Sequence, residues 1–288
     1  MTTSSANFLS PTPSDLAVMS VMKFASKHQL TNESVILEGL AGNDTAVAWS
    51  MRNKFSLEKG NLSAAARSLS GLSTSRADDM RDLLIAHKAP TSDILRGLAG
   101  VGSQRWQEFR LRCLDHKLGL EGLGKSLIGI STSWAHAMRE RLINESIDHH
   151  GAIISLAGLD SDASWSLREQ FLNEEKDLSA LALSTSGLVG DNVMKFRDKL
   201  LVAGAKPDYI AHSLIFNNSP EAWDLRKTLT EVGASPGWIG LGLAQIFTED
   251  SFRFRSELLN KGAELTSIVL GINGDYLSGG LFYKPAQR

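Results

Sequence analysis

One spacing constrains this chain more than any other feature: an arginine recurs every 29 residues, with no insertion anywhere. These repeat arginines are Arg52, Arg81, Arg110, Arg139, Arg168, Arg197, Arg226 and Arg255. The residue before each of them is apolar, and so is the residue three positions after it. A fixed period of roughly 20 to 50 residues indicates a repeat architecture, in which each unit buries its apolar face against its neighbours. The pattern leaves no room for a linker or a second domain.

Each repeat indicates two helices. Seven positions before the repeat arginine stands a Ser, Thr or Gly, which predicts the N-cap of a first helix of about 12 residues. A second N-cap is expected eleven positions after the arginine, at Ser63, Ser92, Ser179, Asp208 and Thr266, before a helix of about two turns. A column of glycines is then expected to end this short helix in a left-handed conformation, namely Gly71, Gly100, Gly129, Gly158, Gly187 and Gly274.

These columns predict an all-α fold, a right-handed α-solenoid superhelix of about nine two-helix repeats over residues 14–274. A Ser or Gly sixteen positions after each arginine lets neighbouring short helices approach closely, so we expect them to line the concave side. The opposite curvature stays open as an alternative. Residues 1–13 are expected to be a disordered tail. Residues 275–288 depart from the repeat and are expected to form a cap, covering the last apolar face with Tyr276, Leu281, Phe282 and Tyr283.

Composition narrows the classes of function. A net charge of −2 and a pI near 6.4 do not favour a nucleic-acid binder. Cys113 is the only cysteine, which excludes an intrachain disulfide and a thiolate zinc site and favours a cytoplasmic location. No apolar run is long enough for a membrane span, so no membrane partner is expected. His149 and His150 lack a partner at metal-ligand spacing, and we expect no catalytic residue, cofactor or metal.

The repeat arginines have two interpretations. In the first, each guanidinium donates to carbonyls at the end of a neighbouring helix while its stem packs on the core. In the second, the arginines form a regular ladder of positive charge that binds phosphates or carboxylates, because a guanidinium suits both geometries. The sequence leaves both open.

Two further columns vary from repeat to repeat and are candidates for binding a partner, with simple packing as the alternative. The column three before the arginine includes Trp49, Trp165 and Trp223, and each indole is expected to lie against its repeat arginine. The column fifteen after the arginine changes from basic to apolar along the chain: Arg67, Arg96 and Lys125, then Ile154, Leu183, His212, Leu241 and Leu270. An acidic and apolar protein segment would match this gradient better than a nucleic acid would.

With these columns, the chain resembles the α-solenoid superfamily of HEAT, armadillo and tetratricopeptide repeats over about residues 14–274. The resemblance implies an architecture and no particular activity. In layout the repeat also resembles the DNA-reading units of bacterial transcription-activator-like effectors, but their Gly-rich base-reading turn is not reproduced here. The uncharged, Ser/Thr-rich amino terminus resembles the leader of some bacterial injected effectors, which implies delivery into a host cell.

The sequence thus favours a non-enzymatic scaffold that binds a partner protein or peptide along the groove of the solenoid. The alternative is a modular nucleic-acid-binding protein whose repeat arginines contact phosphates at regular spacing. The oligomeric state stays open, because an unpaired helix face at either end of a solenoid could pair with a second copy.

Overall fold

The computed structural model describes residues 13–57, 60–174 and 177–274, and all regular secondary structure in these ranges is helical, as the sequence predicts. The longer helices are α1 (Pro13–Lys27), α3 (Ala46–Leu57), α5 (Ser75–Ala86), α7 (Gln104–Asp115), α8 (Ser133–Asn144), α10 (Asp162–Asn173), α12 (Asp191–Val202), α14 (Pro220–Glu231) and α16 (Glu249–Asn260). The shorter ones are α2 (Glu33–Glu38), α4 (Leu62–Arg67), α6 (Thr91–Arg96), α9 (His149–Ile154), α11 (Leu178–Ser184), α13 (Pro207–His212), α15 (Pro236–Leu241) and α17 (Leu265–Asn273).

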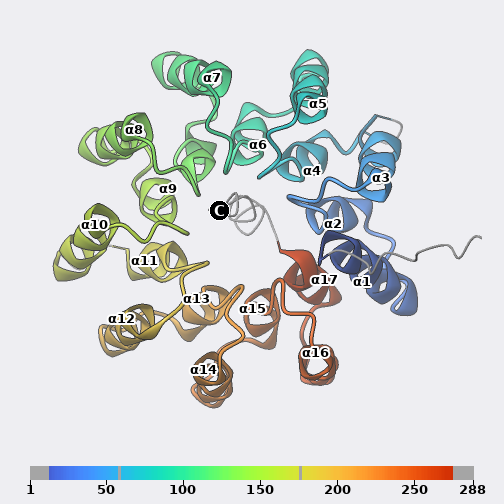
Figure 1. Ribbon diagram of the computed structural model, residues 1–288, viewed down its shortest axis with the longest axis vertical. Helices are drawn as coiled ribbons and strands as arrows, with labels where there is room; N and C mark the ends of the chain where they lie inside the picture. The colour runs from blue at the N-terminus through green and yellow to red at the C-terminus, as the bar shows by residue number, and fades with distance from the viewer. Residues whose placement is uncertain (1–12, 58–59, 175–176, 275–288) are drawn as a thin grey trace, which may run out of the picture.

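The helices form two concentric layers, with the short helices inside and the longer helices outside (Figure 1). Consecutive short helices pack directly against one another, as α11, α13, α15 and α17 do. The expectation that the short helices line the concave side is therefore confirmed. The expected superhelix, by contrast, closes on itself, because α17 packs against both α1 and α2. The end faces that the sequence left without a partner cover each other.

Close approach of the inner backbones explains the small residues sixteen after each repeat arginine. A Cβ added to Gly97 would lie 2.0 Å from the carbonyl oxygen of Ala66 in the preceding repeat, and one added to Gly242 would lie 1.9 Å from that of Ala211. Backbone hydrogen bonds also cross between repeats, since the N–H of Gly71, which has a left-handed backbone, donates to Ala99 O over 2.7 Å. The inner layer is thus held together by backbone contact as well as by side chains.

A side chain replaces one of these backbone bonds where the ring closes. In the interior of the ring, the carbonyls of Ala99, Ile128, Ser186 and Ala244 accept an N–H from the preceding repeat. Ala41 O holds the equivalent position in the first repeat, and it accepts instead from Asn273 Nδ2 of the last repeat over 2.9 Å. Gln245 Nε2 donates to both Oδ1 and the backbone oxygen of Asn273 and so orients its amide.

The predicted N-cap positions are correct for the longer helices, although Ser103 and Thr132 make no side-chain cap hydrogen bond, and they are wrong for the short helices. The hydroxyls of Thr74, Ser161, Ser219 and Thr248 accept backbone N–H groups at the starts of α5, α10, α14 and α16. The expected second caps, Ser63, Ser92, Ser179, Asp208 and Thr266, all lie inside their helices. The short helices begin two residues earlier, with Pro207 and Pro236 as first helical residues and Asp148 and Asp177 as caps.

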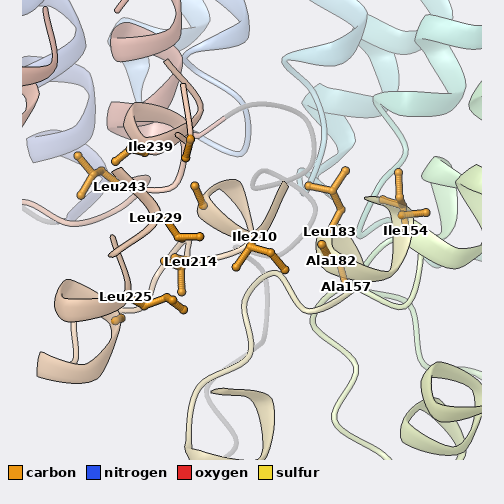
Figure 2. Close-up of a cluster of buried hydrophobic side chains, with 14 of the residues drawn as sticks. Ile154, Ala157, Ala182, Leu183, Ile210, Leu214, Leu225, Leu229, Ile239 and Leu243 are labelled. Carbon is orange, nitrogen blue, oxygen red and sulfur yellow. The ribbon is translucent and has the colours of Figure 1, made fainter. Parts of the chain in front are cut away.

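The apolar columns form a core that continues from one repeat to the next. Figure 2 shows this between α9 and α15, where Ile154, Leu183, Ile210, Leu214, Ile239 and Leu243 come from consecutive short segments. None of these residues is more than 8% exposed. The expected tail over residues 1–13 and the expected cap over residues 275–288 lie outside the described residues, apart from Pro13 at the start of α1.

One repeat departs from the others. The segment after α7 forms two 3-10 turns, η1 (Leu120–Gly122) and η2 (Lys125–Leu127), in place of an α-helix. Gly122 and Gly124 weaken a helix at this point because glycine loses the most backbone freedom on ordering. Both glycines also lie against neighbouring backbone, since a Cβ on Gly124 would come within 2.3 Å of Gly151 C.

Candidate partner-binding surfaces

The repeat arginines are all buried, with at most 1% of each residue exposed. In every repeat, Nη2 donates to the carbonyl twelve positions earlier, at the end of the preceding short segment, and to the carbonyl sixteen positions later, at the end of the repeat's own short segment. For Arg168 these acceptors are Leu156 O at 2.7 Å and Ser184 O at 2.9 Å. The last carbonyls of a helix have no partner within it, so each arginine satisfies two helix ends and joins two repeats.

The residue sixteen after the arginine divides the repeats into two kinds. Where it is a serine, its hydroxyl accepts from the arginine Nε, as Ser126 does from Arg110 over 2.9 Å. Where it is Gly97, Gly242 or Gly271, the arginine Nε of that repeat has no hydrogen-bond partner among the described residues. The glycine repeats therefore bring the short helices closer together at the cost of one hydrogen bond.

Burial lowers the pKa of the arginines to about 9 in Arg110, Arg197 and Arg255 and to about 10 in Arg81 and Arg168. All of them therefore keep their charge at neutral pH, and that charge is stabilised by backbone carbonyls. The interpretation in which the guanidinium donates to carbonyls agrees with this geometry. The interpretation as an anion-binding ladder does not, because the guanidinium groups are buried and present no surface to a phosphate.

The tryptophans three positions before the arginine lie against it, as expected. The guanidinium carbon is 4.8 Å from the indole centroid in the pairs Trp49–Arg52 and Trp165–Arg168, and 5.0 Å in Trp223–Arg226. Trp49 is 1% exposed and has no free surface for a partner. Trp165 and Trp223 are partly exposed on the outer layer, so they are separated from the inner residues with which the sequence grouped them.

Two of the inner candidate residues, Arg67 and Arg96, are paired with carboxylates. Arg67 forms ion pairs with Glu38 and with Asp93, the latter at 2.7 Å, and Arg96 also reaches Asp93 at 3.1 Å. Lys125 is partly buried, as is Leu241, and Leu183 is 8% exposed. The basic half of the gradient is thus partly neutralised by carboxylates that the sequence analysis did not place beside it.

The described residues contain neither a cluster of metal ligands nor a helix suited to span a membrane. They hold no group of three or more His, Cys, Asp or Glu side chains that could bind a metal ion. None of the helices that they form is long and apolar enough to cross a membrane.

Cys113 is buried, and burial raises the pKa of its thiol to about 11, so it stays protonated. His150 pairs with Asp177 through Nδ1 at 2.5 Å, on the surface between two repeats.

Three hollows of the surface lie between successive outer helices. One of about 860 Å³ lies between α5, α6 and α7, and is called here the α5–α7 groove. Others of about 590 Å³ and 300 Å³ lie between α14 and α16 and between α10 and α12. Trp223 and Trp165 line these two, each packed edge-on against a phenylalanine of the next repeat, Phe254 and Phe196.

The α5–α7 groove combines an apolar floor with a charged rim. Trp106 and Phe109 meet edge-on at its floor, with ring centroids 5.5 Å apart. Ile85 and Leu118 also line it and are unusually exposed for large apolar residues, at 40% and 50%. Its rim carries Asp82, Lys88, Arg105, Arg112 and His116. A concave site with apolar walls and a few charged groups is typical of binding sites for peptides and other ligands.

This groove is not among the sites predicted from the sequence, although the sequence carries a signal for it. Four positions before the repeat arginine the chain carries Ala, Ser or Val in every repeat except one, where Trp106 stands. Trp106 is 1% exposed, and its Nε1 donates to Asp78 Oδ1 on α5 over 2.7 Å. A bulky indole in a column of small residues fills the space between two outer helices at the place where the α5–α7 groove is found.

Comparison with known proteins adds no further assignment, because no family model, curated protein or solved structure matches this chain.

Proposed function

We propose that this protein is a non-enzymatic scaffold, an α-solenoid of about nine repeats closed into a ring, that binds segments of a partner protein in the grooves between its outer helices. The observation that carries the proposal is the α5–α7 groove. Its volume of about 860 Å³ and its exposed Ile85 and Leu118 provide an apolar surface that packing within the fold leaves uncovered.

The different roles of the inner and outer layers support the same proposal. Hydrogen bonds to the repeat arginines and close backbone packing hold the inner layer, so the outer residues are free to vary without loss of the fold. The expected binding role of the inner residues is less well supported, since Arg67 and Arg96 are already paired with carboxylates. The nucleic-acid alternative loses its main argument because the repeat arginines are buried.

Selection from a displayed library of helical peptides tests this proposal. Ile85 and Leu118 are half exposed, so the double variant Ile85→Glu, Leu118→Glu should fold while losing the apolar wall of the groove. Val202→Glu, at a residue that is 90% exposed on α12, is the matched control. We expect selected peptides to bind the control like the parent protein and to bind the double variant at least about tenfold more weakly, a loss of about 1.4 kcal/mol.

Two results would contradict the proposal. One is a library that yields no binder to the folded protein; the other is a set of binders that the double variant retains in full. Circular dichroism of each variant checks that a loss of binding does not reflect unfolding.

A further inference from the structure

The charges around the α5–α7 groove are unevenly placed. Near the start of α7, Arg105 is paired with Asp82 of α5, and both residues line the groove. At the other end, where α5 and α7 finish, lie Lys88, Arg112 and His116. Neither Lys88 nor Arg112 forms an ion pair with a carboxylate among the described residues. The rim therefore has a neutralised end and a basic end.

The basic end is contiguous with the apolar floor. The Arg112 guanidinium lies 6.0 Å from the ring centroid of Phe109, within reach of a weak cation–π contact. Phe109 packs in turn on Trp106. A ligand lying on the partly exposed Phe109 would therefore also meet the positive charge of Arg112.

The groove between α14 and α16 provides an internal contrast. Its rim carries Lys227, Arg253 and Lys261 but also Glu231, Asp250 and Glu257, so the two signs balance. Arg253 is moreover paired with Asp250 at 2.5 Å. Among the lining residues of the α5–α7 groove, Asp82 is the only carboxylate, and it is already engaged by Arg105.

We propose that the α5–α7 groove binds an amphipathic segment of a partner protein whose apolar side chains cover Ile85, Phe109 and Leu118 and whose Asp or Glu side chains meet Lys88 and Arg112. This inference rests on the proposed function and specifies the chemistry of the partner. Opposite charges across an interface chiefly set specificity and the rate of association, while the apolar contact supplies affinity.

A protein segment fits this surface better than a nucleic acid does. Proteins that bind the phosphate backbone of a nucleic acid present an extended basic surface. Their affinity for the nucleic acid grows with each phosphate that they neutralise. Here the basic side chains are few and stand beside apolar walls, with Asp78 and Asp82 on the same outer helix α5. Such a surface favours a ligand that alternates apolar and acidic residues.

Three fluorescent helical peptides of about 16 residues, measured by anisotropy, test the inference. They share the same Leu and Trp positions on one face, and their remaining positions carry Glu, Gln or Lys. We expect the Glu peptide to bind at least about tenfold more tightly than the Gln peptide at about 50 mM salt, and this preference to shrink at about 300 mM salt as the charges are screened. The Lys peptide is expected to bind most weakly.

Charge reversal assigns the preference to its residues. In the double variant Lys88→Glu, Arg112→Glu we expect the order of the Glu and Lys peptides to reverse. The matched control Lys227→Glu, Lys261→Glu changes as many charges in the α14–α16 groove, and we expect it to keep the preference for Glu. All four side chains are exposed, so both variants should fold.

The outcomes separate this inference from the proposed function. If the Glu and Gln peptides bind equally well and Ile85→Glu, Leu118→Glu still abolishes binding, the groove binds peptides but the acidic partner is wrong. If the preference for Glu survives reversal of Lys88 and Arg112, the inference also fails. If no peptide, including those selected from the library, binds the protein, the proposed function itself falls.

Discussion

The inner and outer layers of the ring follow different rules, although each repeat contributes to both. In the inner layer, neighbouring short helices are in backbone contact, and the repeat arginines donate to the helix ends of two repeats. In the outer layer the longer helices stand on a larger circle, and grooves open between them. The comparison teaches that one regular set of residues can fix the curvature and leave the outer surface available for binding.

Loss of a repeat arginine should have the largest effect, because it removes the donor that the inner layer depends on. Arg168→Met leaves the carbonyls of Leu156, Leu159 and Ser184 buried without this donor and should lower the free energy of unfolding by about 3–5 kcal/mol. Arg253→Met on the outer layer removes only an exposed pair with Asp250 and should cost less than about 0.5 kcal/mol. Urea unfolding of both variants measures the difference; equal costs would remove the distinction between the layers.

Truncating a core side chain of the inner layer should come next. Leu156 is 1% exposed and belongs to the apolar column seventeen after the arginine. Leu156→Ala should destabilise the protein by about 2–5 kcal/mol through lost burial and the cavity left behind. The half-exposed Leu118 of the outer groove is the control, and Leu118→Ala should cost well under half as much. A cost below about 1 kcal/mol for Leu156→Ala would show that the column is not core.

The seam of the ring is the place where the last repeat meets the first. A substitution there should destabilise only the helices beside it. Asn273→Ala removes the donor to Ala41 O and should cost about 1–3 kcal/mol, because that carbonyl is then buried without its partner. Hydrogen exchange should accelerate in α1, α2 and α17 while α9 and α11 on the far side keep their protection. Asn192→Ala, at an exposed residue of α12, serves as the control. Uniform acceleration around the ring would argue against a distinct seam.

The smallest effect is expected from removing the serine hydroxyl that distinguishes the serine repeats from the glycine repeats. Ser126→Ala removes the acceptor of Arg110 Nε and should cost about 1–2 kcal/mol, since a buried donor loses its partner. Ser103→Ala, at the exposed start of α7 where the hydroxyl makes no cap hydrogen bond, should be nearly neutral. Thermal unfolding of the two variants resolves the difference, and a neutral Ser126→Ala would mean that the serine column serves only close packing.

Much of the fold was open to prediction from sequence because its determinants are local and periodic. The apolar columns, the caps of the longer helices and the left-handed Gly71 and Gly100 each depend on residues close together in the chain. The caps predicted for the short helices lie two residues too late, because a Ser or Thr inside a first turn resembles a cap. The observed caps include Asp148, Asp177 and a residue that precedes a proline. The candidate site was predicted less well, since Trp49 proved buried and Arg67 proved paired.

By itself, the sequence determined that this chain is a stack of helix pairs with small residues inside and a repeat arginine at each junction. Only the tertiary structure decided that the stack closes into a ring, that the arginines donate to carbonyls of two different repeats, and where the outer helices separate into grooves. The reason is physical. A pattern within one repeat specifies its helices, but curvature accumulates from small rotations between repeats, and contacts such as Asn273 to Ala41 join residues from opposite ends of the chain.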